Sequence, residues 1–250
     1  MDLIKDIKPV SLKNFVRPIQ HEIQCPFTNT RECTIIHMID QPQPIRHKYI
    51  TEVILNYIKT CMEGAIGRII IFDTYYVWNT KNKYFNKLTS SLSPEQADRI
   101  RIVNTRNSTA AIIKSMVSLK DPDSPLLEKS DAEVPIGLVI IDNISTFYWG
   151  TKQQGTLVQE YKALGSVLKK TQSTLGCSII STSWDKKFNI LQDTNSENEL
   201  ELKYTAIPKE FFQFTDQIYS FSCNMKTKQV FCKFVDCLEG GKEIEFTDSI

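Results

Sequence analysis

The sequence predicts an α/β fold with a central, mostly parallel β-sheet. Short apolar runs rich in β-branched residues alternate along the chain with longer segments of helical periodicity. This alternation is typical of βαβ units, in which helices cover both faces of a parallel sheet. With 41% hydrophobic and 24% charged residues among 250, the composition is that of a globular protein. We therefore expect one compact domain.

Seven runs have the composition of strands. Five are expected to be parallel and central, at residues 34–39, 68–72, 100–103, 137–141 and 177–182. Two more, residues 217–223 and 229–236, are separated by a polar connection short enough for a hairpin. They predict a C-terminal antiparallel extension, followed by a turn at Gly240 and Gly241.

Crossover helices are expected between these strands, at residues 48–61, 94–99, 109–119 and 156–175. The last has the clearest pattern, because Leu157, Tyr161, Leu164 and Leu168 recur at helical spacing and form an apolar stripe. Residues 121–133 are interpreted as an exposed loop, and the long polar segment 185–209 as a functional one.

Charge and cysteine content exclude several classes of protein. The net charge of +1 gives no global field toward nucleic acid or membrane, so a DNA contact would need a local patch. The seven cysteines include no CxxC pair, which argues against zinc and favours buried thiols in a reducing compartment. No signal peptide or apolar run of about 18 residues is evident, which predicts an intracellular chain.

Asp142 ends the apolar run that starts at Gly137. In P-loop ATPases an Asp at the end of such a strand holds the magnesium ion of the bound nucleotide, the Walker B position. The pattern is weak by itself, because any buried parallel strand can end in an Asp that caps the following turn.

Three segments resemble recombinase paralogues of the RecA superfamily. Residues 141–149 resemble the Walker B run of eukaryotic paralogues, residues 69–74 resemble the second core strand with its Asp-Thr ending, and residues 175–182 resemble the strand before the second DNA loop. The resemblance extends from about residue 34 to the C-terminus. It implies a RecA-like three-layer core over residues 31–250, preceded by a lead-in of residues 1–30.

The ATPase apparatus of that superfamily is absent from this sequence. A phosphate loop needs glycines, a Lys and a Ser or Thr. Residues 40–48 contain two prolines and no glycine, so they cannot form a nest of N–H groups around phosphates. By the resemblance, Tyr75 replaces the water-activating Glu and Trp184 replaces the phosphate-sensing Gln. We expect no enzyme activity, no nucleotide cofactor and no metal, with Asp142 a relic that accepts local backbone donors.

Among the paralogues, the chain most resembles the Psy-type subunit of the Shu complex, which is not an ATPase. Residues 7–15 also resemble the opening of that subunit, and a human-type paralogue with an Asp-Ser-Leu-Ser-Ala-Phe-Tyr-Trp run is a near competitor. The resemblance implies a nuclear protein of homologous recombination repair. It would form a heterodimer with a second paralogue and further Shu-type subunits, bind single-stranded or forked DNA, and promote assembly of a recombinase filament.

The family places DNA loops after the Walker B strand and after the fifth strand, here residues 148–155 and 185–208. Tyr148, Trp149, Trp184, Phe188 and Tyr204 could stack on bases. The second loop has five acids against three lysines, which argues against strong DNA binding. The lysines that could neutralise phosphates are Lys152, Lys186, Lys187 and Lys203.

The sequence leaves the roles of several other residues open. Phe15 could dock into a partner subunit or cover this chain's own sheet. The three histidines, His21, His37 and His47, are isolated, and none is assigned as a ligand. Two alternative functions remain: an NTPase in which Arg46 or Lys48 replaces the phosphate-loop Lys, and a scaffold that does not contact DNA.

Overall fold

The computed structural model describes most of the chain between residues 18 and 249. The described ranges are 18–25, 30–40, 45–60, 67–105, 108–121, 124–127, 134–184, 207–224, 229–234 and 246–249.

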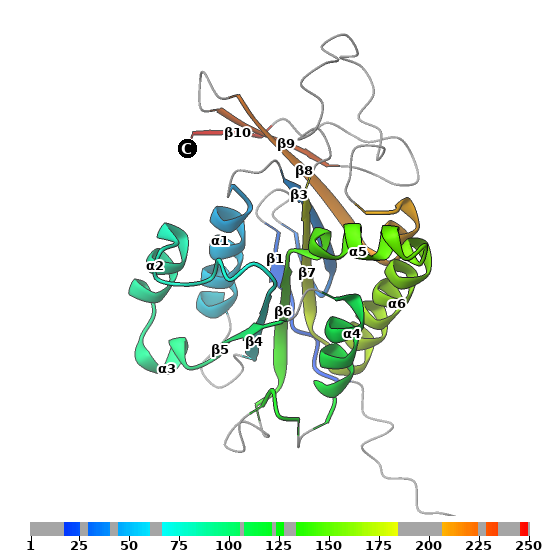
Figure 1. Ribbon diagram of the computed structural model, residues 1–250. Coiled ribbons are helices and arrows are strands. Elements are labelled where there is room, and N and C mark those ends of the chain that lie inside the picture. The colour runs from blue at the N-terminus through cyan, green and yellow to red at the C-terminus, as the bar shows by residue number, and fades with distance from the viewer. Residues whose placement is uncertain are drawn as a thin grey trace, which may run out of the picture.

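Among the described residues, the main sheet has eight strands in the order β10-β9-β8-β3-β7-β6-β4-β5 (Figure 1). Six of them, from β8 to β5, are parallel to their neighbours, and β9 and β10 pair antiparallel. The strands are β3 (Ile35–Asp40), β4 (Arg68–Asp73), β5 (Ile100–Asn104), β6 (Ile136–Asp142), β7 (Ser178–Trp184), β8 (Gln217–Asn224), β9 (Gln229–Phe234) and β10 (Phe246–Ser249).

This sheet confirms the predicted fold class, with two differences. Strand β5 lies at the edge of the sheet and not in its centre. Strand β8 pairs parallel with β3, and the antiparallel extension begins only at its hairpin partner β9. The parallel direction of β8 follows from η6 (Lys209–Phe214), which packs on α6 (Leu157–Leu175) and returns the chain to the amino-terminal end of β3. Asp216 there donates its N–H to the carbonyl of Ile35.

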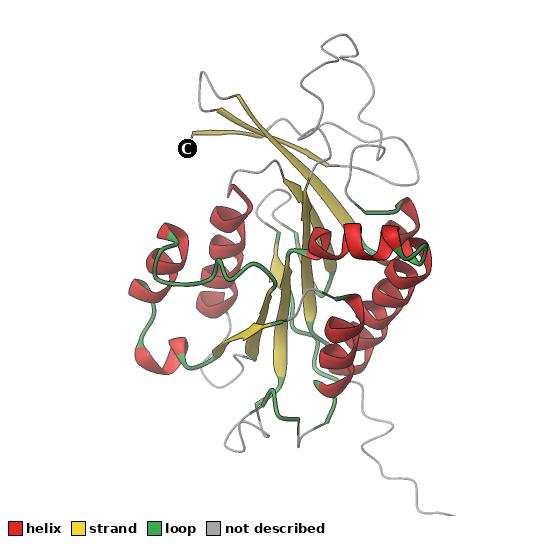
Figure 2. Cartoon of the chain, in the orientation of Figure 1, coloured by secondary structure: helices red, strands yellow, loops and turns green. Residues whose placement is uncertain are grey.

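Helices cover both faces of the sheet (Figure 2), as expected for a three-layer core. On one side lie α1 (Ile45–Thr60), α2 (Lys83–Ser90) and α3 (Pro94–Ala97), and on the other α4 (Thr109–Ser118), α5 (Tyr148–Gln153) and α6. Helices α2 and α5 were not predicted, because both are short and α2 buries only Leu88. The remaining elements are β1 (Ile23–Gln24), β2 (Arg31–Glu32) and η3 (Ile144–Phe147).

Side chains of the parallel strands alternate between two apolar cores. Ile69 and Ile71 belong to the core beneath α1, whereas Ile70 and Phe72 belong to the core beneath α4 and α6. The predicted stripe of α6 is buried at Tyr161, as it is at Leu164 and Leu168. Because each of these strands is buried on both faces, the polar residues at the strand ends are held in fixed positions.

The prediction that the cysteines are buried thiols is confirmed for three of those that the structure describes. Cys25, Cys177 and Cys232 are buried free thiols, and Cys33 is half-buried. Burial raises the pKa of the Cys177 thiol to about 12, so it stays protonated near neutral pH. Within the described ranges, no helix is long and apolar enough to cross a membrane.

Candidate functional site

Strands β3, β4, β6 and β7 end in polar or aromatic residues, and these residues lie together along the edge of the sheet formed by the carboxyl ends of the strands. Asp73 of β4 is directly paired with Asp142 of β6, and Asp40 of β3 is paired with Trp184 of β7. Parallel α/β sheets bind ligands at the carboxyl ends of their strands, so this edge is the candidate site.

The carboxylate of Asp142 is the centre of the site. It is fully buried and accepts four hydrogen bonds from side chains that lie far away in the sequence. The donors are Arg46 Nε at 2.8 Å, His47 Nε2 at 2.8 Å, Trp78 Nε1 at 2.9 Å and Thr182 Oγ1 at 2.7 Å. The expectation that Asp142 satisfies local backbone donors is therefore wrong. Its partners come from α1, the segment after β4, and β7.

Arg46 carries the positive charge of the site and lies in the first turn of α1. Its side chain is only 6% exposed, and its guanidinium lies between two buried carboxylates. Besides the bond to Asp142, its Nη1 is 3.5 Å from Asp40 Oδ2, and its backbone N–H donates to the same oxygen over 3.1 Å. A cation bound at Asp142 would have to displace this guanidinium.

The two carboxylates respond in opposite ways to the single guanidinium. Burial alone would raise the pKa of Asp142, but Arg46 and the donors His47 and Thr182 hold that pKa well below its usual range. For Asp40, burial dominates and raises the pKa to about 7, although Arg46 opposes this shift. Burial lowers the pKa of Arg46 less than its two carboxylates raise it. The positive charge of Arg46 is thus balanced mainly by the negative charge of Asp142.

The segment after β4 is folded back over the site by Asp73. The carboxylate of Asp73 accepts backbone N–H groups of Tyr75, Val77 and Trp78 at 2.8–3.1 Å. This turn brings the Trp78 indole onto Asp142, and it leaves Tyr76 with a positive φ of 57°. The segment between β4 and α2 (Lys83–Ser90) therefore covers the Asp142 carboxylate.

An aromatic pair occupies the two positions that, by the resemblance to the superfamily, would correspond to its catalytic Glu and Gln. The rings of Tyr75 and Trp184 lie 4.8 Å apart between centroids, at an interplanar angle of 31°. The backbone N–H of Trp184 donates to the hydroxyl of Ser145, which joins the end of β7 to the turn after β6. Neither ring can act as a general base as a carboxylate would.

The predicted DNA residues fall into two groups. Lys152 lies on α5, so residues 148–153 form a short helix and not the expected loop. Its Nζ lies 5.3 Å from the ring centroid of Tyr148 and 5.4 Å from that of Trp149, which is 59% exposed. Trp184 is half-buried. The remaining candidates lie outside the described residues: Phe15, Lys186, Lys187, Phe188, Lys203 and Tyr204.

Sequence reasoning missed most members of the buried cluster. Arg46 was considered only as a replacement for the phosphate-loop Lys, and His47 was set aside as isolated. Trp78 and Thr182 carried no signal, because their contact with Asp142 spans 64 and 40 residues of sequence. The other histidines are core residues: His37 lies between two serine hydroxyls, and His21 faces the hydroxyl of Tyr57.

Comparisons with known proteins support the fold and identify the family. The crystal structure of the RadB recombinase aligns with 86% of this chain and 86% of its own, at a TM-score of 0.57 and 12% sequence identity, which supports the fold alone. No curated protein matches the chain significantly. The family model described as "Shu complex component Psy3, DNA-binding description" matches residues 7–222. The chain therefore belongs to the Psy3 family of Shu complex components.

Proposed function

We propose that this chain is a non-catalytic recombinase-paralogue subunit that works through binding surfaces. It pairs with a second paralogue, contacts recombination intermediates or forks, and promotes recombinase filament assembly in the nucleus during homologous recombination repair. Membership of the Psy3 family and the recombinase-like fold support a role in homologous recombination. The observation that carries the non-catalytic assignment is the Arg46 guanidinium on Asp142.

A nucleotide-binding relative needs a cation that faces the phosphates and a carboxylate that is free for magnesium. Here the guanidinium of Arg46 points into the protein and neutralises the carboxylate of Asp142. Separating a buried ion pair of this kind costs about 3–5 kcal/mol. Asp142 already accepts four side-chain hydrogen bonds, so a magnesium ion could bind there only by breaking this network.

Equilibrium dialysis with labelled ATP and magnesium tests the assignment. We expect no saturable binding at millimolar nucleotide and no hydrolysis. Saturation at micromolar nucleotide that is lost in the Asp142→Asn variant would contradict it and favour the NTPase alternative. The variant Thr171→Val is a suitable control, because its buried hydroxyl has no hydrogen-bond partner among the described residues and lies away from the site.

We further propose that DNA contacts include Lys152 and Trp184, together with Lys186, Lys187 and Lys203 of the second loop. The exposed Trp149 beside Lys152 supports this, because an aromatic face next to an ammonium group suits a stacked base and its phosphate. Fluorescence anisotropy with single-stranded and forked DNA should show weaker binding for Lys152→Ala. The control Lys170→Ala, at an exposed position of α6, should bind like the wild type.

We propose that partner docking involves the lead-in of residues 1–30, with Phe15 as the candidate anchor, and that residues 31–250 form the RecA-like core. Ile23 and Cys25 of the lead-in are themselves buried in the core beneath α1, so they are not part of the proposed docking surface. Phe15→Ala should lose the partner subunit in a pull-down while its thermal unfolding midpoint stays unchanged. An unchanged pull-down would remove Phe15 from the interface.

A scaffold without DNA contact is the second candidate, and the excess of acids in residues 185–208 favours it. Replacing Lys186, Lys187 and Lys203 by Glu separates the two. Unchanged DNA affinity of the reconstituted heterodimer would remove this loop from the DNA site.

A further inference from the structure

A second surface with the chemistry of a nucleic-acid site lies between β4 and the end of α2. From Thr74 to Pro94 the sequence has three lysines and no acidic residue, since Asp73 precedes it and Glu95 follows it. The three lysines, Lys81, Lys83 and Lys87, are exposed. Aromatic residues are interleaved with them. Residues 185–208, by contrast, combine three lysines with five acidic residues.

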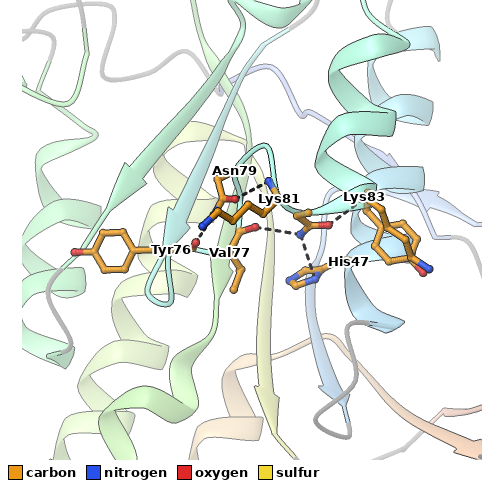
Figure 3. Close-up of a pocket in the computed structure, with 8 residues that line it drawn as sticks. His47, Tyr76, Val77, Asn79, Lys81 and Lys83 are labelled. Carbon is orange, nitrogen blue, oxygen red and sulfur yellow. Dashed lines mark hydrogen bonds between the residues drawn. The ribbon is translucent and has the colours of Figure 1, made fainter.

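A pocket of about 460 Å³ opens on this surface (Figure 3). Pockets of this volume are large enough for a small organic ligand. Its polar lining combines two ammonium groups, two phenol rings, two amides and an imidazole, from Lys81, Lys83, Tyr76, Tyr84, Asn79, Asn82 and His47.

The lining is held in place by hydrogen bonds within the segment. The Asn82 side chain donates to the carbonyl of Val77, faces His47 Nδ1 at 3.4 Å, and accepts the N–H of Tyr84. The Asn79 side chain accepts the N–H of Lys81. The ammonium groups therefore extend from a fixed backbone, and Lys83 Nζ stays 4.9 Å from the Tyr84 ring.

Tyr76 is the most exposed aromatic residue of the described chain, at 61%, and its backbone is in the left-handed region. A non-glycine residue in that region costs on the order of 1 kcal/mol and is retained where the surrounding structure requires it. Its neighbour Tyr75 stacks on Trp184, at the root of the second DNA loop.

We infer that this pocket and Tyr76 bind a segment of single-stranded nucleic acid, with backbone phosphates on Lys81 and Lys83 and a base on Tyr76. The inference rests on the proposed DNA-binding function and extends it to a second contact region. Charge complementarity favours a polyanion, and exposed ring faces favour a ligand that has bases to stack. An acidic protein segment would use the lysines but not the exposed ring.

The experiment uses the full chain and a fluorescein-labelled oligothymidylate, with anisotropy titrations at 50, 100 and 200 mM salt. Two lost phosphate contacts should reduce the salt slope by about 1.4, because each contact on a single strand contributes about 0.7. We expect Lys81→Ala/Lys83→Ala to show this change and roughly tenfold weaker binding at low salt. Tyr76→Ala should bind at least about fivefold more weakly at every salt concentration, with the slope unchanged.

The matched control is Lys114→Ala/Lys170→Ala, which removes the same charge from exposed positions of α4 and α6. Equal losses in the control and the test variant would overturn the inference, because they would reflect net charge alone. Wild-type affinity in all variants would also overturn it, while DNA binding by the wild type would leave the proposed function intact. Loss of a co-purifying subunit with unchanged DNA affinity would assign the surface to a protein partner instead. A wild-type chain that binds no DNA would contradict the proposed function itself.

Discussion

Replacing Arg46 by Met tests whether the buried guanidinium holds the carboxyl edge of the sheet together. The change keeps much of the side-chain length but removes the guanidinium that lies between Asp40 and Asp142, both of which are fully buried. Removing one partner of a buried pair costs about 3–5 kcal/mol, because the remaining charge is uncompensated. That is a large part of a total stability of roughly 5–15 kcal/mol.

Urea unfolding followed by circular dichroism measures the effect. With a slope near 3 kcal/mol/M, the midpoint should fall by about 1–2 M. The control is Arg31→Met, since Arg31 pairs with Glu22 on the surface, with side chains 46% and 48% exposed. Exposed pairs of this kind contribute about 0–1 kcal/mol. If Arg46→Met costs no more than Arg31→Met, the guanidinium does not stabilise the edge, and the reasoning on which the non-catalytic assignment rests fails.

Thr182→Val should destabilise the fold by about 1.5–3 kcal/mol, because it removes a hydroxyl donor from the charged Asp142, and Thr182→Ser should restore most of that stability in the same urea assay. Gly165→Ala should cost about 1–3 kcal/mol, because its new Cβ would lie 2.2 Å from a phenyl carbon, whereas Gly150→Ala meets nothing within 4 Å and should be neutral or stabilising by up to about 1 kcal/mol. Asp40 should make the protein less stable as the pH rises from 4 to 7: its folded-state pKa is about 7 against a usual 3.8, so only the folded state holds the proton in this window. In the same window His37 acts in the opposite direction, because burial lowers its folded-state pKa to about 3. The test is therefore the difference between stability curves: the stability of the wild type relative to Asp40→Asn should fall as the pH rises from 4 to 7, and a difference that does not change with pH would contradict the raised pKa.

Much of the fold was predictable because its strands are buried on both faces. Continuous apolar runs such as residues 137–141 can only be core strands, and a helix with the stripe of α6 can only lie on them. The position of β5 at the edge and the direction of β8 were not predictable. Both depend on where a connection crosses the sheet, and the hydrophobic pattern of a strand does not encode that path.

The sequence by itself determined that no phosphate nest forms after the first core strand, because prolines and the lack of glycine act locally through the backbone. By its resemblance to the recombinase paralogues, it also predicted aromatic residues, Tyr75 and Trp184, at the positions of the catalytic Glu and Gln. Only the tertiary structure decided which contacts are made at the carboxyl ends of the strands: Arg46 turns inward onto Asp142, and Tyr75 contacts Trp184, which lies 109 residues further along the chain. These contacts join elements that are distant in sequence, so their energies depend on burial and on exact pairing that appear only when the sheet is assembled.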